Sequence, residues 1–174
     1  VFDKTGTLTA GTPKLTDLVA VPGHEEKDVL FIAATAERGS EHPLGEAIVK
    51  GAEEQGISPR KAENFHSIPG KGVEAYFEEK RILLGTRKLM EEERFSFKEL
   101  EAEMRDFEES GKTAMLVAFG EEIIGLVAVA DTLKENSREA IETLIKMGLE
   151  VVMITGDNVV TANAIAKEVG IPRV

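Results

Sequence analysis

The sequence predicts an α/β protein that carries an inserted α+β domain, and three observations indicate this fold class. First, residues 151–154 are a short apolar run of the fully buried type, followed by a Gly turn and a helical pattern over 159–169. Second, the chain opens on two apolar residues that end in Asp3, as a buried strand would. Third, short β patterns separated by turn residues fill the middle, which favours antiparallel pairing. The two ends therefore belong to one parallel sheet, with ligands at the carboxyl ends of its strands.

The individual elements follow from apolar spacing and from turn residues. Pro43 suits the first position of a helix, and Gly56 stops that helix. We expect helices at 25–38, 43–55, 87–94, 97–110, 134–147 and 159–169. We expect strands at 15–21, 62–68, 72–77, 81–84, 113–119, 123–130 and 151–154. We place the first part of the α/β domain at 1–12, the inserted domain at 13–129 and the second part of the α/β domain at 130–174.

The composition sets limits on function. The chain has 174 residues, of which 42% are hydrophobic, and this is enough for a packed core. Charged residues make up 30%, and the net charge of −11 argues against nucleic-acid binding. There is no cysteine, so disulfides and thiolate metal sites are excluded, and the three histidines show no zinc-ligand spacing. No apolar run approaches the roughly 18–20 residues of a membrane helix. We therefore expect a soluble domain or pair of domains.

Asp3 is the first candidate catalytic residue. It stands at the end of an apolar strand and is followed by a run of Thr and Gly. The backbone N–H groups of such a turn can hold a phosphate, and the carboxylate at its head is placed for in-line attack on phosphorus. The structural alternative is a strand-end Asp that caps a turn.

Residues 3–9 read Asp-Lys-Thr-Gly-Thr-Leu-Thr, which resembles the phosphorylation signature of the P-type ATPases, members of the haloacid dehalogenase-like superfamily. The resemblance implies a Rossmann-like phosphorylation domain in which Asp3 accepts the γ-phosphoryl group of ATP. It also implies catalytic roles for Asp3, Lys4 and Thr5, with Mg²⁺ bound at Asp3 and Thr5. Related phosphatases carry a second Asp, as general acid and base, where this chain has Thr5. Because Thr cannot activate water at neutral pH, the site suits a pump better than a phosphatase.

Thr155, Gly156 and Asp157 follow the short C-terminal strand and resemble the second signature of the same family. A hydroxyl and a backbone N–H at a strand-to-helix turn can bind phosphoryl oxygens as charge develops on them. The resemblance assigns Thr155 and Gly156 to the transferred phosphate. It assigns Asp157 either to the order of the loop or to the ribose or magnesium side of the nucleotide.

Residues 131–134, Asp-Thr-Leu-Lys, also resemble a family element, found at the hinge where the inserted domain rejoins the phosphorylation domain. A salt-bridged or helix-capping Asp131 is the structural alternative. The two interpretations stay open on the sequence alone.

The middle of the chain narrows the resemblance to the heavy-metal subclass of P-type ATPases, type IB. Residues 40–43 read Ser-Glu-His-Pro, and Glu37 stands five residues before His42. Two Gly elements follow, Gly70-Lys71-Gly72 and Gly85. An imidazole at a helix start can stack on or bond to adenine, and a carboxylate can accept the adenine amino group. Glycines let the backbone approach a nucleotide closely. The resemblance assigns ATP binding to Glu37, His42, Gly70, Lys71, Gly72 and Gly85.

The resemblance implies the ATP-binding and phosphorylation region of a metal pump, with ATP and Mg²⁺ as cofactors. Membrane helices, an actuator domain and the transported ion, copper before zinc, cadmium or cobalt, belong to other parts of such a pump. We expect a cytoplasmic region whose phosphorylation domain is incomplete, so that the 174-residue chain alone is a poor or inactive ATPase. Two alternatives remain. One is a stand-alone haloacid dehalogenase-like phosphatase with an inserted cap, and the other is a nucleotide-binding module without chemistry.

Overall fold

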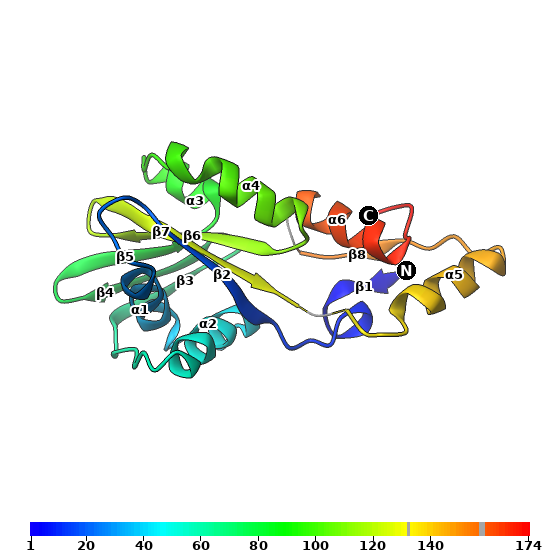
Figure 1. Cartoon of the computed structure of the whole chain (residues 1–174), viewed down its shortest axis with the longest axis horizontal. Helices are drawn as coiled ribbons and strands as arrows, with labels where there is room; N and C mark the ends of the chain where they lie inside the picture. The colour runs from blue at the N-terminus through cyan, green and yellow to red at the C-terminus, as the bar shows by residue number, and fades with distance from the viewer. Residues whose placement is uncertain (132, 157–158) are drawn as a thin grey trace.

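The computed structural model describes residues 1–131, 133–156 and 159–174, and it consists of a large and a small lobe (Figure 1). Both ends of the chain lie in the small lobe. The large lobe holds a six-stranded antiparallel sheet with the strand order β2-β7-β6-β5-β4-β3. Its strands are β2 (Lys14–Ala20), β3 (Glu63–Ile68), β4 (Gly72–Phe77), β5 (Lys80–Gly85), β6 (Thr113–Phe119) and β7 (Glu122–Ala130).

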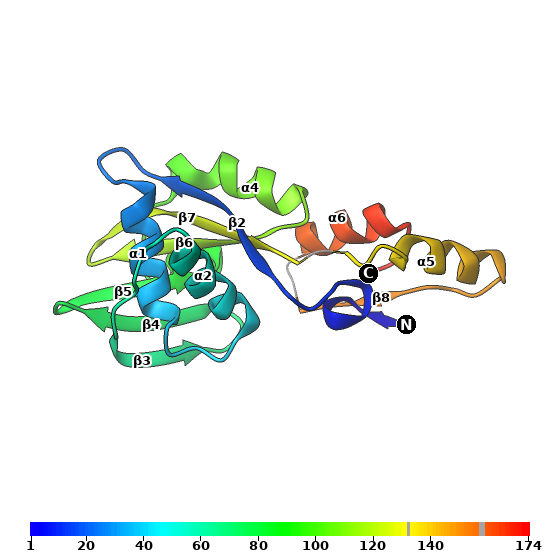
Figure 2. The ribbon, with the colours of Figure 1, turned by 60° about the horizontal axis from the view of Figure 1, so that its bottom comes forward.

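Helices cover both faces of this sheet, because successive strand residues point to opposite sides and both sides are apolar. On β5, Ile82 and Leu84 belong to the core under α1 (Glu26–Glu37) and α2 (Pro43–Glu54). Leu83 between them belongs to a second core on the other face. The elements on that face are α3 (Arg87–Glu92), the 3-10 turn η2 (Lys98–Leu100) and α4 (Glu101–Glu109). Figure 2 shows α4 on one side of the sheet and α1 with α2 on the other.

The small lobe is built around two short parallel strands, β1 (Phe2–Asp3) and β8 (Met153–Ile154). The π-helical turn η1 (Lys4–Leu8) and the helices α5 (Ser137–Lys146) and α6 (Val159–Val169) complete this lobe. A separate apolar core joins these elements, with Leu8, Ile141, Met153 and Ile165 among its buried members. The predicted parallel sheet at the ends of the chain and antiparallel sheet in its middle are both confirmed.

The predicted helices and strands are all present, although several differ in their bounds; the strand expected at 151–154, for example, covers only Met153–Ile154. The helix expected from residue 97 begins with the 3-10 turn η2. The helix expected from residue 134 starts at Ser137, because Lys134 is engaged elsewhere: its backbone N–H donates to the Leu8 carbonyl at 3.0 Å. The run after Asp3 is a compact helical turn rather than an open Thr/Gly turn. The domain boundaries stay a prediction, although the large sheet begins at Lys14 and ends at Ala130.

Asp131 joins the two segments that cross between the lobes. Its carboxylate oxygens accept hydrogen bonds from the backbone N–H groups of Gly11 and Thr12, each at 3.2 Å. Asp131 thus binds the backbone of the incoming crossover segment, so these hydrogen bonds are not the helix cap that was the structural alternative, and the hinge role stays a prediction. Among the described residues, no helix combines the length and the apolar character needed to span a bilayer.

Candidate functional site

The two phosphate motifs of the sequence meet at the end of the parallel strand pair. Asp3 ends β1 and pairs with Ile154, the last residue of β8, so that Thr155 and Gly156 leave the sheet beside it. The carboxyl ends of parallel strands are where α/β folds place their ligands. Asp3 is exposed, and an added Cβ at Gly156 would meet no atom within 4 Å, so the turn is open to a ligand. Asp157, the third residue of the second motif, lies outside the described residues.

The turn that follows Asp3 is held from both sides. Inside it, the Gly6 N–H donates to Thr9 Oγ1 at 3.2 Å. From the α5 side, Lys134 Nζ donates to the Gly6 carbonyl at 2.6 Å and the Ser137 hydroxyl donates to the Leu8 carbonyl at 2.7 Å. The backbone of Lys4 and Thr5 lies in this turn, and their side chains are outside what the structure describes. Lys134 therefore brings a positive charge to the turn that follows Asp3. The 131–134 motif predicted a hinge at this residue but not its contact with the turn.

A cleft of about 1260 Å³ lies between the large lobe and the turn at Thr155 and Gly156. Its lining includes eight of the residues that the sequence assigned to ATP or phosphate: Glu37, His42, Gly70, Lys71, Gly72, Gly85, Thr155 and Gly156. The structure thus brings both groups of predicted residues into one concavity, as expected of a ligand site. Asp3 does not line the cleft. It lies next to it, through the strand pair that leads into Thr155.

Glu37 is one of two buried acids among the described residues that line this cleft, and Glu108 is the other. Glu37 ends α1 and its residue surface is only 6% exposed. Burial raises the pKa of its carboxyl, and a hydrogen bond from the Ser40 hydroxyl opposes that shift in part. Its Oε2 atom is buried without a hydrogen-bond partner. Because buried acceptors are nearly always paired, this oxygen is suited to a donor supplied by a ligand, such as the amino group of adenine.

His42 is fixed by the start of α2, which it caps. The His42 Nδ1 atom accepts a hydrogen bond from the backbone N–H of Leu44 at 3.2 Å, and the backbone N–H of His42 donates to Ser40 Oγ at 3.2 Å. Pro43 at the first helical position keeps the entry in register. With Nδ1 acting as acceptor, the neutral imidazole carries its proton on Nε2, at the exposed end of the ring. His42 can therefore offer a ring face and one N–H donor to a ligand in the cleft.

Two glycines of the cleft have a structural reason to lack a side chain, and their predicted contact with a nucleotide stays a prediction. Gly72 and Gly85 face each other across the β4–β5 pair. A Cβ on Gly72 would lie 2.1 Å from the Leu84 carbonyl oxygen, and a Cβ on Gly85 would lie 2.1 Å from the Lys71 carbonyl oxygen. Their missing side chains thus allow the close approach of two strands, and the space nearest them is filled by backbone. Lys71, predicted as part of the ATP site, is paired with Glu92 at 2.6 Å.

This geometry predicts a large stability effect at Gly72 and a small one at Gly70. Gly72→Ala is expected to lower the free energy of unfolding by about 2 kcal/mol or more, because the backbone has φ +147° and no neighbouring atom can yield. Gly70→Ala keeps an unfavourable φ of +69° but meets open space, so a loss of about 1 kcal/mol is expected. Urea unfolding of both variants measures the difference. Equal losses would mean that the strand contact does not limit position 72.

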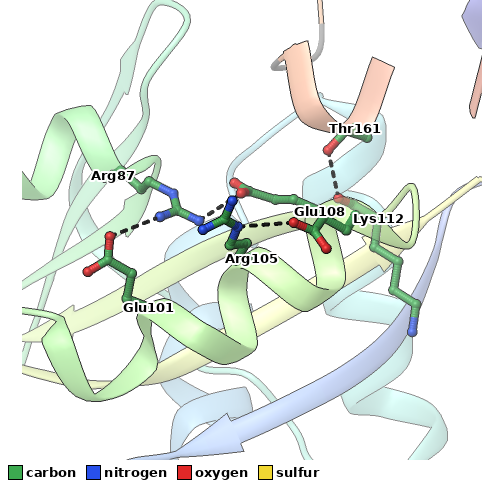
Figure 3. A network of polar contacts seen from close by, with 7 residues as sticks. Arg87, Glu101, Arg105, Glu108, Lys112 and Thr161 are labelled. Carbon is green, nitrogen blue, oxygen red and sulfur yellow. Dashed lines mark hydrogen bonds and ion pairs between the residues drawn. The ribbon is translucent and has the colours of Figure 1, made fainter. Parts of the chain in front are cut away.

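Charged residues of α3 and α4 form one wall of the cleft, shown in Figure 3. Arg87 contacts the largely buried Glu108 through Nη2 at 2.7 Å and Glu101 through Nη1 at 3.6 Å. Near the same helix, the Thr161 hydroxyl of α6 donates to the Lys112 carbonyl at 3.0 Å and so ties the small lobe to the large one. Sequence reasoning missed these residues, because they are 21 and 49 positions apart and match no motif.

The fold and the site define a class of protein: an α/β unit that carries a candidate phosphate site at its parallel strands and a candidate nucleotide site beside its antiparallel sheet. Residues 1–174 match the family model of the haloacid dehalogenase-like hydrolases. The chain belongs to the haloacid dehalogenase-like hydrolase family.

Curated relatives place the resemblance within that family. The chain is 52% identical over 174 residues to the copper-exporting P-type ATPase of Bacillus subtilis (strain 168), matching all of this chain and 22% of that protein. It is 46% identical over 175 residues to the copper-exporting P-type ATPase of Staphylococcus aureus (strain N315), matching all of this chain and 21% of that protein. The chain thus spans about a fifth of the length of these relatives. The predicted resemblance to heavy-metal P-type ATPases is confirmed.

Solved structures of P-type ATPases and of their domains are also similar to this chain. A zinc-transporting PIB-type ATPase in the E2.Pi state superposes with a TM-score of 0.73 at 33% identity, covering 99% of this chain and 28% of that one. The catalytic domain of the CPx-ATPase CopB-B, studied for its conformational changes upon nucleotide binding, gives a TM-score of 0.71 at 27% identity, with 98% and 57% covered. The N-domain of HMA8, a copper-transporting P-type ATPase, matches 67% of this chain with a TM-score of 0.56 at 28% identity.

Proposed function

We propose that this chain is the ATP-binding and phosphorylation region of a heavy-metal-transporting P-type ATPase, with copper as the transported ion. One observation carries the proposal: a single cleft runs from Glu37 and His42 in the large lobe to Thr155 and Gly156 beside Asp3. Such a cleft can hold an extended nucleotide with its base at one end and its phosphates at the other. The curated relatives support a pump over a stand-alone phosphatase.

In this proposal the large lobe holds the base and the small lobe performs the chemistry. Glu37 accepts the adenine amino group, His42 contacts the ring, and the segment 70–72 with Gly85 forms the adjoining wall. A carboxylate oxygen of Asp3 attacks the γ-phosphorus in line, the bond to the bridging oxygen of ADP breaks, and ADP leaves. The Thr155 hydroxyl and the Gly156 N–H stabilise the charge that develops on the transferred phosphoryl oxygens.

Mg²⁺ fits this site as a partner of the nucleotide rather than of a complete protein cage. Proteins bind it through one or two carboxylates together with substrate phosphates and water, and Asp3 supplies one carboxylate. The described part of the chain contains no group of three or more acidic or histidine side chains that could hold a metal by itself. When bound, Mg²⁺ neutralises the charge of the phosphates. The assignment of Thr5 as a second ligand stays a prediction.

The partners of the chain follow from the same proposal. The relatives are about five times longer than the matched region, so we propose that membrane and actuator parts of the same pump act with it. Copper is favoured over zinc as the transported ion. The two relatives named as copper exporters are 52% and 46% identical to this chain, whereas the zinc-transporting ATPase is 33% identical.

The proposal is tested by calorimetric titration of ATP, with and without Mg²⁺, into the chain and into His42→Gln. We expect binding that His42→Gln weakens about tenfold, or about 1.4 kcal/mol, because its Nε2–H and ring contact are lost. His66→Gln is the matched control, since His66 is exposed on β3 and outside the cleft lining. If His42→Gln binds ATP as tightly as the unaltered chain does, the adenine base does not bind at His42. Rapid release of phosphate from small phosphomonoesters would instead favour the phosphatase.

A further inference from the structure

Gly45 occupies a position that no motif assigned, at the third residue of α2 and directly against Glu37. A Cβ built on Gly45 would lie 2.3 Å from Glu37 Oε2 and 2.9 Å from the Glu37 carboxyl carbon. It would also lie 3.0 Å from the Cβ of Ser40, the residue whose hydroxyl bonds the Glu37 carboxylate. The carboxylate therefore rests in space that exists only because residue 45 has no side chain.

We propose that Gly45 is a positioning residue that holds the Glu37 carboxylate at the base-binding end of the cleft, an inference that rests on the proposed ATP site. Glu37 Oε2 is a buried oxygen without a hydrogen-bond partner, so packing sets its place together with the one hydrogen bond that the carboxylate receives from the Ser40 hydroxyl. Gly45 belongs to that packing, since Oε2 lies where a Cβ on residue 45 would come within 2.3 Å of it. A side chain at position 45 forces the Glu37 carboxylate to rotate, because the end of a Glu side chain moves more easily than the backbone of α2.

The same helix start positions both groups that face the base. His42 caps α2 and binds the N–H of Leu44, and Gly45 follows as the next residue. At this third position many helices carry a Glu or Gln that reaches back to the cap. Here the carboxylate comes instead from Glu37 at the end of α1, and Gly45 leaves it room. One short turn thus sets the distance between an imidazole and a carboxylate.

A purely structural Gly would behave differently from a positioning one. Gly inside a helix is less favourable than Ala by about 0.8–1.0 kcal/mol, so Gly45→Ala gains helix propensity. The two atoms nearest the added Cβ belong to the Glu37 carboxylate, the far end of a side chain that can rotate, and the Ser40 Cβ at 3.0 Å has to give way only slightly. We therefore expect Gly45→Ala to keep or raise the unfolding temperature while weakening ATP binding about tenfold. Loss of binding without loss of stability is the signature of a displaced ligand group.

The experiment compares ATP binding and thermal unfolding of four proteins: the unaltered chain, Gly45→Ala, Gly39→Ala and the double variant Gly45→Ala/Glu37→Asp. Gly39 is the matched control beside the same loop, since its added Cβ would meet Phe65 at an ordinary 3.5 Å. The double variant is expected to recover part of the lost affinity, because a carboxylate one methylene shorter no longer meets the new methyl group.

The outcomes separate this inference from the proposed function. Equal affinity of Gly45→Ala and the unaltered chain, with ATP bound by both, overturns the role of Gly45 and leaves the ATP site standing. Loss of affinity accompanied by a lower unfolding temperature, without rescue by Glu37→Asp, also overturns it. Absence of ATP binding by the unaltered chain overturns the proposed function, and the role of Gly45 with it.

Discussion

Asp3→Asn is expected to abolish phosphoenzyme formation, by at least about a thousandfold. The amide oxygen of Asn carries no charge and cannot form the acyl phosphate, while its size preserves the packing at the end of β1. The chain can be tested as part of a working pump by exchanging it for the matching segment of the Bacillus subtilis relative, to which it is 52% identical. Incorporation of label from γ-³²P-ATP, followed by its removal with hydroxylamine, reports the aspartyl-phosphate directly.

The control for this experiment is Asp28→Asn, an exposed carboxylate in the first turn of α1 and distant from the cleft lining. It removes one negative charge, as Asp3→Asn does, but should leave labelling unchanged. Hydroxylamine-labile label that persists in Asp3→Asn would show that another residue accepts the phosphoryl group. Label lost in both variants would trace the effect to net charge or folding and not to the nucleophile.

The sequence was sufficient to predict the two sheets and the residues that surround the cleft. The central strands read as continuous apolar runs because helices cover both faces of the sheet, as Ile82, Leu83 and Leu84 illustrate. The phosphate motifs could be paired in space because both follow short apolar strands, and parallel strands present their carboxyl ends together. These predictions rest on local patterns whose geometry is fixed by backbone regularity alone.

Contacts between elements could not be predicted in the same way. The pairing of Arg87 with Glu108 joins two helices across the cleft wall and leaves no spacing signal in the sequence. The strand approach at Gly72 and Gly85 needs the β4–β5 register, which a Gly-x-Gly pattern does not specify. The position of the Glu37 carboxylate against Gly45 depends on how α1 and α2 pack together. Each is a tertiary contact that overrides or reinterprets a local motif.

The buried carboxyl of Glu37 lowers the free energy of unfolding in a way that depends on pH. Burial raises the pKa of its carboxyl, against a smaller opposing effect of the Ser40 hydroxyl. Between the ordinary glutamate pKa and the raised folded-state pKa, the folded chain binds more protons than the unfolded chain. Stability therefore falls as pH rises through that window, and the full deficit is present above it. Below the ordinary pKa the carboxyl is protonated in both states and the deficit vanishes.

Glu37→Met is accordingly expected to stabilise the chain while it removes ATP binding. Methionine matches the length of glutamate but has no acceptor, so the adenine amino group would be left without a partner. We expect a loss of affinity of about a hundredfold, or about 2.7 kcal/mol. In the absence of ATP, removing a buried carboxylate with a partnerless oxygen should raise the free energy of unfolding at neutral pH by about 1–3 kcal/mol. Calorimetry and urea unfolding measure the two effects separately.

Two comparisons make the Glu37 result specific. Glu37→Gln keeps an acceptor oxygen but loses the charge, so its affinity should fall between those of Glu37→Met and the unaltered chain. The stability gain of Glu37→Met should shrink as pH is lowered toward the ordinary glutamate pKa, because the unaltered chain then regains what its buried charge had removed. A gain that stays constant with pH would assign the effect to packing of the methionine. Unchanged ATP affinity in Glu37→Met would remove Glu37 from the base-binding site.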